Sequence, residues 1–292
     1  MSKRNILITG GSGIIGSLLI QALKEKNSIY YISRKYIDDS DIIHIPIDLS
    51  DDFRPSDLPK KIDAIVHLAQ SENFRSFPEK AIDIFYVNTL STLKLLDYAK
   101  KSGVKNFIYT SSGGVSNNND RNFFKNGKMN SAGDLNFYFN TKLCSEIIME
   151  SYSSFFNVIV LRLFFVYGSH QKSTMLIPRL IEYIKRGEKI VLNGYNGIKI
   201  NPIHVSDVVN SITRAVNLKK NCRIDIAGPE VLSLREIAIT IGQTLKIKPR
   251  FKILTDTGPL PNLIGDIAKM KKLLESPRIK FQDGIDQMVH LD

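Results

Sequence analysis

The sequence predicts an α/β fold built on a doubly wound parallel sheet, followed by a smaller C-terminal lobe. Short apolar runs alternate with stretches of helical periodicity through the first half of the 292 residues, and this rhythm becomes less regular after Phe164. With 43% hydrophobic residues and no low-complexity tract, the chain can bury a large core, as one domain or two closely joined ones.

Each element follows in order from these patterns. In the first part we expect strands at residues 5–9, 29–33, 42–47, 64–68, 106–110 and 158–163, and helices at 14–23, 79–101 and 137–152. In the second part we expect helices at 175–186, 205–216 and 233–245 and a strand at 224–226. Ser233 and Glu236 have the spacing of a capping box. The polar segment 117–134 is expected to be a surface loop, and so is 249–261, which contains three prolines.

The domain boundaries follow from the same change of rhythm. Residues 1–163 and 203–221 are expected to form one domain, and residues 164–202 and 222–292 the smaller lobe. No signal peptide is expected, because Thr9-Gly10-Gly11 interrupts the first apolar run. The apolar stretch 158–166 is broken by Arg162 and is too short to span a membrane.

Charge and cysteine content narrow the class of protein. The formal net charge is +11, but the basic residues are scattered in short pairs such as Lys100-Lys101, Lys219-Lys220 and Lys271-Lys272. Without an arginine-rich arm or a stacking motif, a solvated surface is favoured over a nucleic-acid interface. Cys144 and Cys222 make no disulfide framework and fit a reducing cytoplasm, and no His/Cys cluster suggests a metal.

Three glycines lie between the first expected strand and the first expected helix. Gly10 permits a tight turn, Gly13 lets the backbone approach phosphates, and Gly16 lets the helix pack close to the sheet. The N–H groups of the first helical turn, at Ile14 and Ile15, would then face a pyrophosphate. The sequence therefore predicts a Rossmann-like dinucleotide site; the alternative is a glycine-rich turn without a ligand.

The end of the second expected strand bears on the choice of dinucleotide. An acidic residue is expected there in an NAD site, to hold the ribose hydroxyls, but this chain has Ser33-Arg34-Lys35. A guanidinium suits a 2′-phosphate, so NADP(H) is favoured. If Arg34 is instead a solvated surface charge, NAD(H) can bind as well.

A tyrosine and a lysine supply candidate proton chemistry. The pattern Tyr-x-x-x-Lys occurs three times, and only Tyr138 and Lys142 lie on an expected helix, where residues four apart share a face. An ammonium beside a phenol lowers the pKa of the phenol, which makes Tyr138 a candidate general acid or base. Ser112 can orient the reacting oxygen. The alternative is a helix tyrosine that packs on the core.

With these motifs in place, the chain resembles the extended short-chain dehydrogenase/reductase family, the NAD(P)-dependent epimerases, dehydratases and reductases of sugar nucleotides. The resemblance covers nearly the full length. It implies that Asp48 and Leu49 contact the adenine, that Leu68, Ala69 and Gln70 line the cofactor, and that Asn88 is the family's helix asparagine. It also implies catalytic roles for Ser112, Tyr138 and Lys142, of which Tyr138 and Lys142 also contact the cofactor, Lys142 by holding its ribose. A homodimer formed through the helices at 79–101 and 137–152 is a further implication.

Two departures from the family pattern refine this interpretation. Dehydratases carry an acidic pair after the active-site hydroxyl residue, whereas Ser112 is followed by Gly113-Gly114, so dehydration is disfavoured. Many members have an asparagine near Phe165 that contacts the substrate diphosphate. Phe165 cannot donate that hydrogen bond, so Lys172, Arg179 or Lys199 could bind the diphosphate in place of the asparagine. Ser112 and Gly113 are also expected to contact the substrate.

The predicted function is a nucleotide-sugar epimerase of the 4-epimerase type. Arg34 keeps an NADPH-dependent keto-sugar-nucleotide reductase open as an alternative. A second alternative, from another class, is a non-catalytic dinucleotide-binding sensor or assembly subunit, against which the intact Ser112, Tyr138 and Lys142 argue. The expected partners are a nucleotide sugar and a second copy of the chain, with no nucleic acid, no membrane and no metal.

Overall fold

The computed structural model describes residues 3–117, 124–125, 128–129, 135–255 and 261–290. It divides into two compact units, one of residues 1–162 and 212–224 and one of residues 163–211 and 225–292. The expected loop at 117–134 lies largely outside the described residues; the described part includes the short strands β6 (Phe124–Lys125) and β7 (Lys128–Met129).

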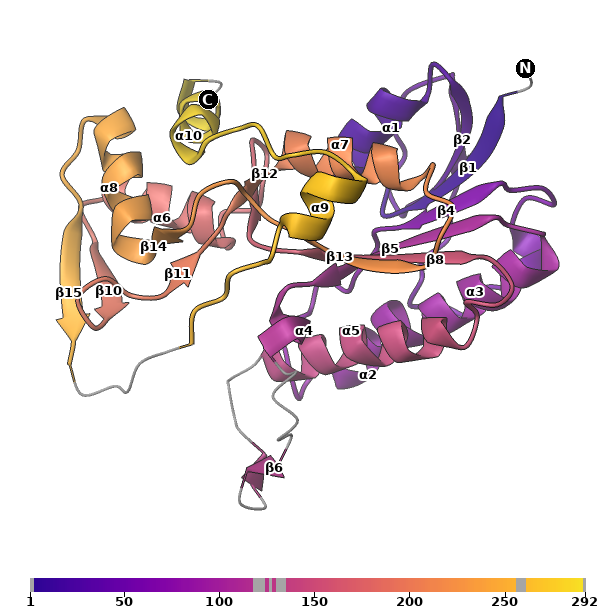
Figure 1. Cartoon of the computed structure of the whole chain (residues 1–292), viewed down its shortest axis with the longest axis horizontal. Coiled ribbons are helices and arrows are strands. Elements are labelled where there is room, and N and C mark those ends of the chain that lie inside the picture. The colour runs from indigo at the N-terminus through magenta and orange to yellow at the C-terminus, as the bar shows by residue number, and fades with distance from the viewer. Residues whose placement is uncertain (1–2, 118–123, 126–127, 130–134, 256–260, 291–292) are drawn as a thin grey trace. The chain divides into compact units, whose positions relative to one another are not determined.

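A seven-stranded sheet forms the centre of the first unit (Figure 1), with the order β13-β8-β5-β4-β1-β2-β3. Its strands are β1 (Arg4–Thr9), β2 (Asn27–Ile32), β3 (Ile42–Ile45), β4 (Ala64–His67), β5 (Asn106–Ser112), β8 (Asn157–Leu163) and β13 (Cys222–Ile226). Parallel ladders join β3, β2, β1, β4 and β5. This architecture confirms the predicted doubly wound α/β fold. The strand order reverses between β1 and β4, and sheets of this kind bind ligands beyond the carboxyl ends of the strands at such a point.

Helices cover both faces of this sheet. Figure 1 shows α1 (Ile14–Leu23) on one face and α2 (Ala81–Phe85), α3 (Ser91–Lys101) and α5 (Leu135–Glu150) on the other. Because both faces are covered, the strands are apolar along their length, and Ile6, Leu7 and Ile8 of β1 are all fully buried. The short helical segments η1 (Pro55–Asp57) and α4 (Gly114–Asn117) complete the described part of this unit, together with the end of α7 (Val205–Ala215).

The expected single helix at 79–101 is interrupted. Between α2 and α3 the chain makes one π-helical turn, η2 (Tyr86–Leu90), in which Asn88 is fully buried. Single π-helical turns within α-helices occur frequently at functional sites. The π-helical turn therefore gives Asn88 a position that a regular α-helix would not give it.

The second unit packs helices against small two-stranded sheets. Its helices are α6 (Leu176–Lys185), α8 (Leu234–Leu245), α9 (Ala268–Leu273) and α10 (Phe281–His290). Its strand pairs are β9 (Val166–Tyr167) with β12 (Ile203–His204), β10 (Lys189–Asn193) with β15 (Arg250–Leu254), and β11 (Lys199–Ile200) with β14 (Leu232–Ser233). The capping box at the start of α8 is confirmed, since Ser233 accepts a hydrogen bond from the Glu236 N–H and the Glu236 side chain accepts from Ser233. A cluster including Tyr167, Ile237 and Phe281 forms its core.

One expectation for this unit was wrong. The segment 249–261 was expected to be a surface loop throughout, but residues 250–254 form β15, which pairs in parallel with β10 over five residues. The prolines lie outside the strand, so they do not remove a ladder donor. Within the described residues, no helix combines the length and the apolar character that crossing a bilayer requires.

Candidate active site

The glycine loop begins at the carboxyl end of β1. Gly10 has a φ of +70°, a left-handed conformation that glycine adopts without strain. A Cβ on Gly16 would lie 2.3 Å from the Gly10 carbonyl oxygen, so the first turn of α1 can pack against the loop only if residue 16 is glycine. Gly13 is the N-cap of α1 and makes no side-chain cap, which leaves the first N–H groups of the helix, at Ile14 and Ile15, for an anion. The loop thus fits the pyrophosphate of a dinucleotide.

Arg34, after the end of β2, is paired with two carboxylates. Its Nη2 donates to Glu72, and its Nη1 lies 3.7 Å from Oδ2 of Asp48. The side chains of Arg34 and Glu72 are each 56% exposed, so solvent screens this pairing. Sequence reasoning placed Arg34 and Asp48 in the cofactor site but missed Glu72, which lies on a different loop. The guanidinium therefore faces two negative charges that would compete with a 2′-phosphate.

The turn after β4 is fastened to β1. The Ala69 N–H donates to Thr9 Oγ1 at 3.1 Å, and the Leu68 N–H donates to the Thr9 carbonyl at 3.3 Å. His67 is fully buried, and its ring nitrogens lie 2.6 Å from Thr9 Oγ1 and 3.0 Å from Thr92 Oγ1. Burial, helped by the positive charge of Lys142, lowers the pKa of His67 to about 3. His67 is therefore a neutral structural residue and not an acid or base.

Asn88 connects this turn to α5. Its Oδ1 accepts a hydrogen bond from the Ser71 N–H at 2.9 Å, and its Nδ2 donates to Thr141 Oγ1 at 3.0 Å. Thr141 Oγ1 donates in turn to the Tyr138 carbonyl at 2.7 Å. The π-helical turn thereby fixes the part of α5 that carries Tyr138 relative to the turn after β4.

Tyr138 lies beside the turn after β4, which the sequence predicted to line the cofactor. Its hydroxyl donates to Gln70 Oε1 at 2.9 Å, and its side chain is 9% exposed. Ser112, at the end of β5, forms a hydrogen bond that favours the ionised phenol, and its Oγ accepts from the Gly114 N–H at 3.3 Å. The structure thus brings together Ser112, Tyr138 and Gln70, which the sequence placed in three separate segments.

Lys142 lies one helical turn after Tyr138 and is 1% exposed. Its Nζ donates to the Thr110 carbonyl at 3.0 Å and lies 4.8 Å from the ring centroid of Tyr109 and 5.9 Å from that of Tyr138. Burial lowers the pKa of Lys142 to about 7, against the opposing effect of Glu146.

The expected lowering of the Tyr138 pKa by Lys142 is not what the structure shows. Burial raises the pKa of Tyr138 above its ordinary value, and only the hydrogen bond with Ser112 opposes this rise. The physical reason is that the ammonium lies over the ring and bonds a backbone carbonyl, and that its own charge is weakened by burial.

Glu146, one further turn along α5, holds a buried ion cluster. It is fully buried and accepts hydrogen bonds from Arg162 on β8 at 3.0 and 2.8 Å, and Arg223 on β13 lies 2.9 Å from it. Its negative charge raises the pKa of Lys142. Sequence reasoning missed Glu146, although the same four-residue spacing that linked Tyr138 to Lys142 also leads to it.

The residues predicted to contact substrate belong to both units. Ser112 and Gly113 lie in the first unit, whereas Phe165, Lys172, Arg179 and Lys199 lie in the second. Phe165 has a φ of +44° and its carbonyl accepts a hydrogen bond from the Ile203 N–H at 3.2 Å. Non-glycine residues in this region are uncommon, and asparagine tolerates it better than phenylalanine does. In the described part of the chain, no group of three His, Cys, Asp or Glu side chains is placed to hold a metal ion.

Known proteins share this architecture over the whole chain. Residues 6–227 match the NAD dependent epimerase/dehydratase family. The chain is 25% identical to the UDP-N-acetyl-alpha-D-glucosaminuronate decarboxylase of Bacillus cytotoxicus, over 98% of this chain and 97% of that protein. It is 24% identical to the putative UDP-glucose 4-epimerase of Methanocaldococcus jannaschii, over 98% and 97%. A crystal structure of the UDP-glucuronic acid 4-epimerase of Bacillus cereus, in complex with UDP-glucuronic acid and NAD, superposes with a TM-score of 0.81 and 25% identity over 99% of this chain and all of that one.

Proposed function

Because the chain belongs to the NAD dependent epimerase/dehydratase family, we propose that it is a nucleotide-sugar 4-epimerase acting on a UDP-linked sugar. The observation that supports this most directly is the hydrogen bond from Tyr138 to Gln70, since it puts an acid–base hydroxyl at the turn that lines the cofactor. Similar proteins along the full length include UDP-sugar 4-epimerases, one of them with NAD bound.

The roles of the side chains follow from their positions. A nicotinamide bound at this site would supply reversible hydride transfer at a sugar carbon. Tyr138 exchanges a proton with the hydroxyl on that carbon, and Ser112 orients the same oxygen. With its raised pKa, Tyr138 is protonated and can donate its proton. To accept a proton it must first be ionised, a state that the hydrogen bond with Ser112 favours. The pKa of Lys142 is about 7, so the charge of this neighbouring side chain changes near neutral pH.

The residues after Ser112 favour epimerisation over dehydration. A Cβ on Gly114 would lie 2.3 Å from the ring of Phe139, so an acidic side chain at this position would require that ring to move. Neither Gly113 nor Gly114 can supply the acid and base that removal of water requires. The acid–base chemistry is then confined to Tyr138 and the sugar oxygen.

The reaction is tested by incubating the protein with UDP-glucose, UDP-glucuronic acid and UDP-N-acetylglucosamine while sugar isomers and cofactor absorbance are followed. We expect interconversion of C4 epimers without net consumption of cofactor. Net oxidation of NADPH in the presence of a UDP-keto sugar would support the reductase that Arg34 favours. Full turnover by Tyr138→Phe would contradict the mechanism. Cofactor binding without turnover on any sugar would favour the non-catalytic alternative.

A matched pair of glycine substitutions tests the cofactor seat. A Cβ on Gly13 would lie 3.3 Å from the Gly10 oxygen, a tight but adjustable contact, whereas one on Gly16 would collide with it. Gly13→Ala should therefore keep the thermal midpoint close to that of wild type and lose dinucleotide binding, because a methyl group there would occupy space that the proposed pyrophosphate needs. Gly16→Ala should lower both. Unchanged NAD(P)H binding in Gly13→Ala would contradict the placement of the pyrophosphate.

The choice between NADP(H) and NAD(H) depends on the surroundings of Arg34. Arg34 supports NADP(H), while its pairing with Asp48 and Glu72 reduces the positive charge available to a 2′-phosphate. Solved relatives such as the Bacillus cereus 4-epimerase carry NAD. We propose that the chain binds both dinucleotides, with NADP(H) preferred, and parallel titrations of NADH and NADPH test the order. Tighter binding of NADH would refute the preference.

The proposal extends to the roles of the two parts of the chain and to its assembly. We assign cofactor binding to residues 1–163 and 203–221 and substrate selection to residues 164–202 and 222–292, with Lys172, Arg179 and Lys199 as candidates for the diphosphate.

A homodimer is supported by exposed apolar side chains on α2, η2, α3 and α5, namely Ile82, Phe85, Tyr86, Leu93 and Ile147. Neither Cys144 nor Cys222 forms a disulfide, which is consistent with the cytoplasm. Sedimentation of wild type and Ile82→Asp tests the dimer, which the variant should weaken.

A further inference from the structure

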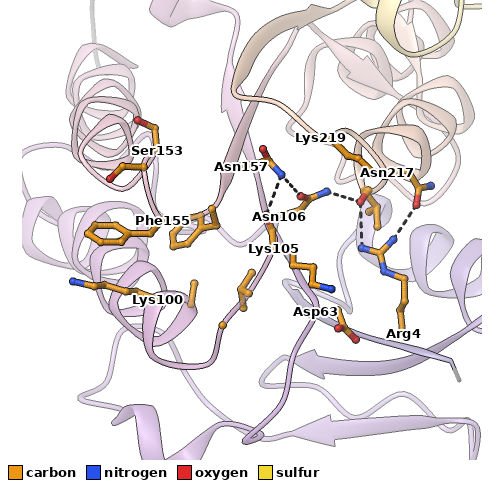
Figure 2. Close-up of a pocket in the computed structure, with 16 residues that line it drawn as sticks. Arg4, Asp63, Lys100, Lys105, Asn106, Ser153, Phe155, Asn157, Asn217 and Lys219 are labelled. Carbon is orange, nitrogen blue, oxygen red and sulfur yellow. Dashed lines mark hydrogen bonds between the residues drawn. The ribbon is translucent and has the colours of Figure 1, made fainter.

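A cavity of about 870 Å³ lies in the first unit at the amino-terminal edge of the sheet (Figure 2). Arg4 begins β1, Asp63 precedes β4, Lys105 precedes β5 and Asn157 begins β8. The strands that carry the cofactor and catalytic residues present those residues at their opposite, carboxyl ends. The cavity is therefore separate from the candidate active site.

The floor of the cavity is a fixed network of amides. Asn106 is 5% exposed, and its Nδ2 donates to the carbonyls of Val216 at 2.8 Å and Leu218 at 2.7 Å. Its Oδ1 accepts from Asn157 Nδ2 at 2.8 Å, which also donates to the Lys105 carbonyl at 3.2 Å. These bonds hold together β5, β8 and the segment after α7, so the cavity is formed before any ligand arrives.

Four cationic side chains line this cavity, and they come from four separate segments. They are Arg4, Lys100, Lys105 and Lys219. Arg4 donates to Asn217 Oδ1 at 2.9 Å and to the Val216 carbonyl, and Lys100 lies 4.1 Å from the ring centroid of Phe155. Within the described part of the chain, none of the four forms a salt bridge. The one carboxylate in the lining, Asp63, accepts the Asn5 N–H at 2.8 Å.

One side of the cavity carries an aromatic ring beside a lysine, and the other side carries an arginine and a lysine. Figure 2 shows Lys100 and Phe155 on one side of the cavity and Arg4, Asn217 and Lys219 on the other. Phe155 is 54% exposed, and the Lys100 ammonium lies over one face of its ring. The basic pairs at 100–101 and 219–220, interpreted from the sequence as scattered surface charge, thus each contribute a lysine to one concave site.

We propose that this cavity binds a small polyphosphate anion. Three surplus positive charges in a preformed hollow would attract several phosphate groups, and guanidinium and ammonium groups are the side chains that bind phosphate most strongly. The volume falls within the range of small-molecule pockets, about 300–1,000 Å³. Phosphates would lie between Arg4, Lys105 and Lys219, and the ring of Phe155 would stack on a base if the anion is a nucleotide.

Calorimetric titration of the full-length protein tests this site. ATP and inorganic tripolyphosphate are titrated separately, with excess NADH present so that the cofactor site is filled. The matched variants are Lys105→Gln/Lys219→Gln and, as a control that removes the same charge elsewhere, Lys271→Gln/Lys272→Gln. We expect wild type and the control to bind, and the first double variant to bind at least about ten-fold more weakly. Affinity should fall between about 50 and about 200 mM KCl.

The outcomes separate the possibilities. Absence of binding in wild type, or equal loss of affinity in both double variants, would overturn the proposal. If Phe155→Ala weakens ATP binding and leaves tripolyphosphate unchanged, the site is established as a nucleotide site. If that variant binds both probes as wild type does, the site recognises the phosphate chain alone. All four substituted lysines are exposed, so equal thermal midpoints are expected and serve as the check on folding.

Discussion

Replacing Lys142 by methionine should change how the stability of the protein depends on pH. In the unfolded chain the lysine ionises near its ordinary value of 10.5, whereas burial lowers the pKa in the folded protein to about 7. Between these values the unfolded chain binds more protons than the folded one, so the free energy of unfolding of wild type rises with pH. One pKa unit corresponds to about 1.4 kcal/mol, so the contribution of Lys142 changes by about 2 kcal/mol between about pH 7 and about pH 9.

The measurement is urea unfolding of cofactor-free wild type and Lys142→Met over this pH range. Lys142→Met lacks the titrating group, so its advantage over wild type should be largest near pH 7 and shrink by about 2 kcal/mol as the pH rises. Groups common to both proteins cancel in the difference. Lys271→Met, which removes an exposed lysine, should differ from wild type by a constant amount. A constant difference for Lys142→Met as well would refute the buried, weakly basic lysine.

Three further outcomes follow from the contacts. Glu146→Ala leaves the buried Arg162 guanidinium without its carboxylate and should lower the free energy of unfolding in urea by about 3 kcal/mol. Glu182→Ala, in an exposed pair, should change it by less than about 0.5 kcal/mol. Glu72→Gln should raise the ratio of NADPH to NADH affinity about five-fold in fluorescence titrations, because one competitor for Arg34 is neutralised; an unchanged ratio would show that Arg34 does not meet the 2′-phosphate. Lys246→Gly should raise the thermal midpoint through about 1 kcal/mol of added stability, since residue 246 ends α8 at a φ of +56°.

The parts of the fold that sequence reasoning predicted are those with local causes. The glycine loop needs only a strand, a left-handed turn and a helix that packs closely, and all three are encoded within residues 4–23. The capping box at Ser233 is equally local. By contrast, β15 pairs with β10, some sixty residues earlier in the chain, and flanking prolines concealed it. Pairing between distant segments leaves little trace in the pattern of a single short strand.

In the candidate site, too, features with local causes could be predicted and features that depend on distant segments could not. Tyr138 and Lys142 could be found because four-residue spacing on a helix brings side chains to one face. The direction of the Tyr138 pKa could not, since it depends on burial and on the Thr110 carbonyl that Lys142 bonds. Glu72 was missed because its partner Arg34 lies 38 residues away. The pKa of a side chain depends on its burial and on its distances to other groups in the folded protein. The sequence identifies the ionisable groups but contains no distances.

The π-helical turn at residues 86–90 has a consequence for how this chain tolerates change in length. A π-helical turn holds one residue more than the α-helical turn it replaces, so the helix before it and the helix after it are out of phase by about 100°. Deleting one residue there would let α2 and α3 merge into a continuous helix, a locally favourable structure. The same deletion would rotate Asn88 away from Ser71 and Thr141 and release α5 from the cofactor-lining turn. A chain shortened in this way would keep the helix but would no longer hold Tyr138 on α5 in place beside the turn after β4.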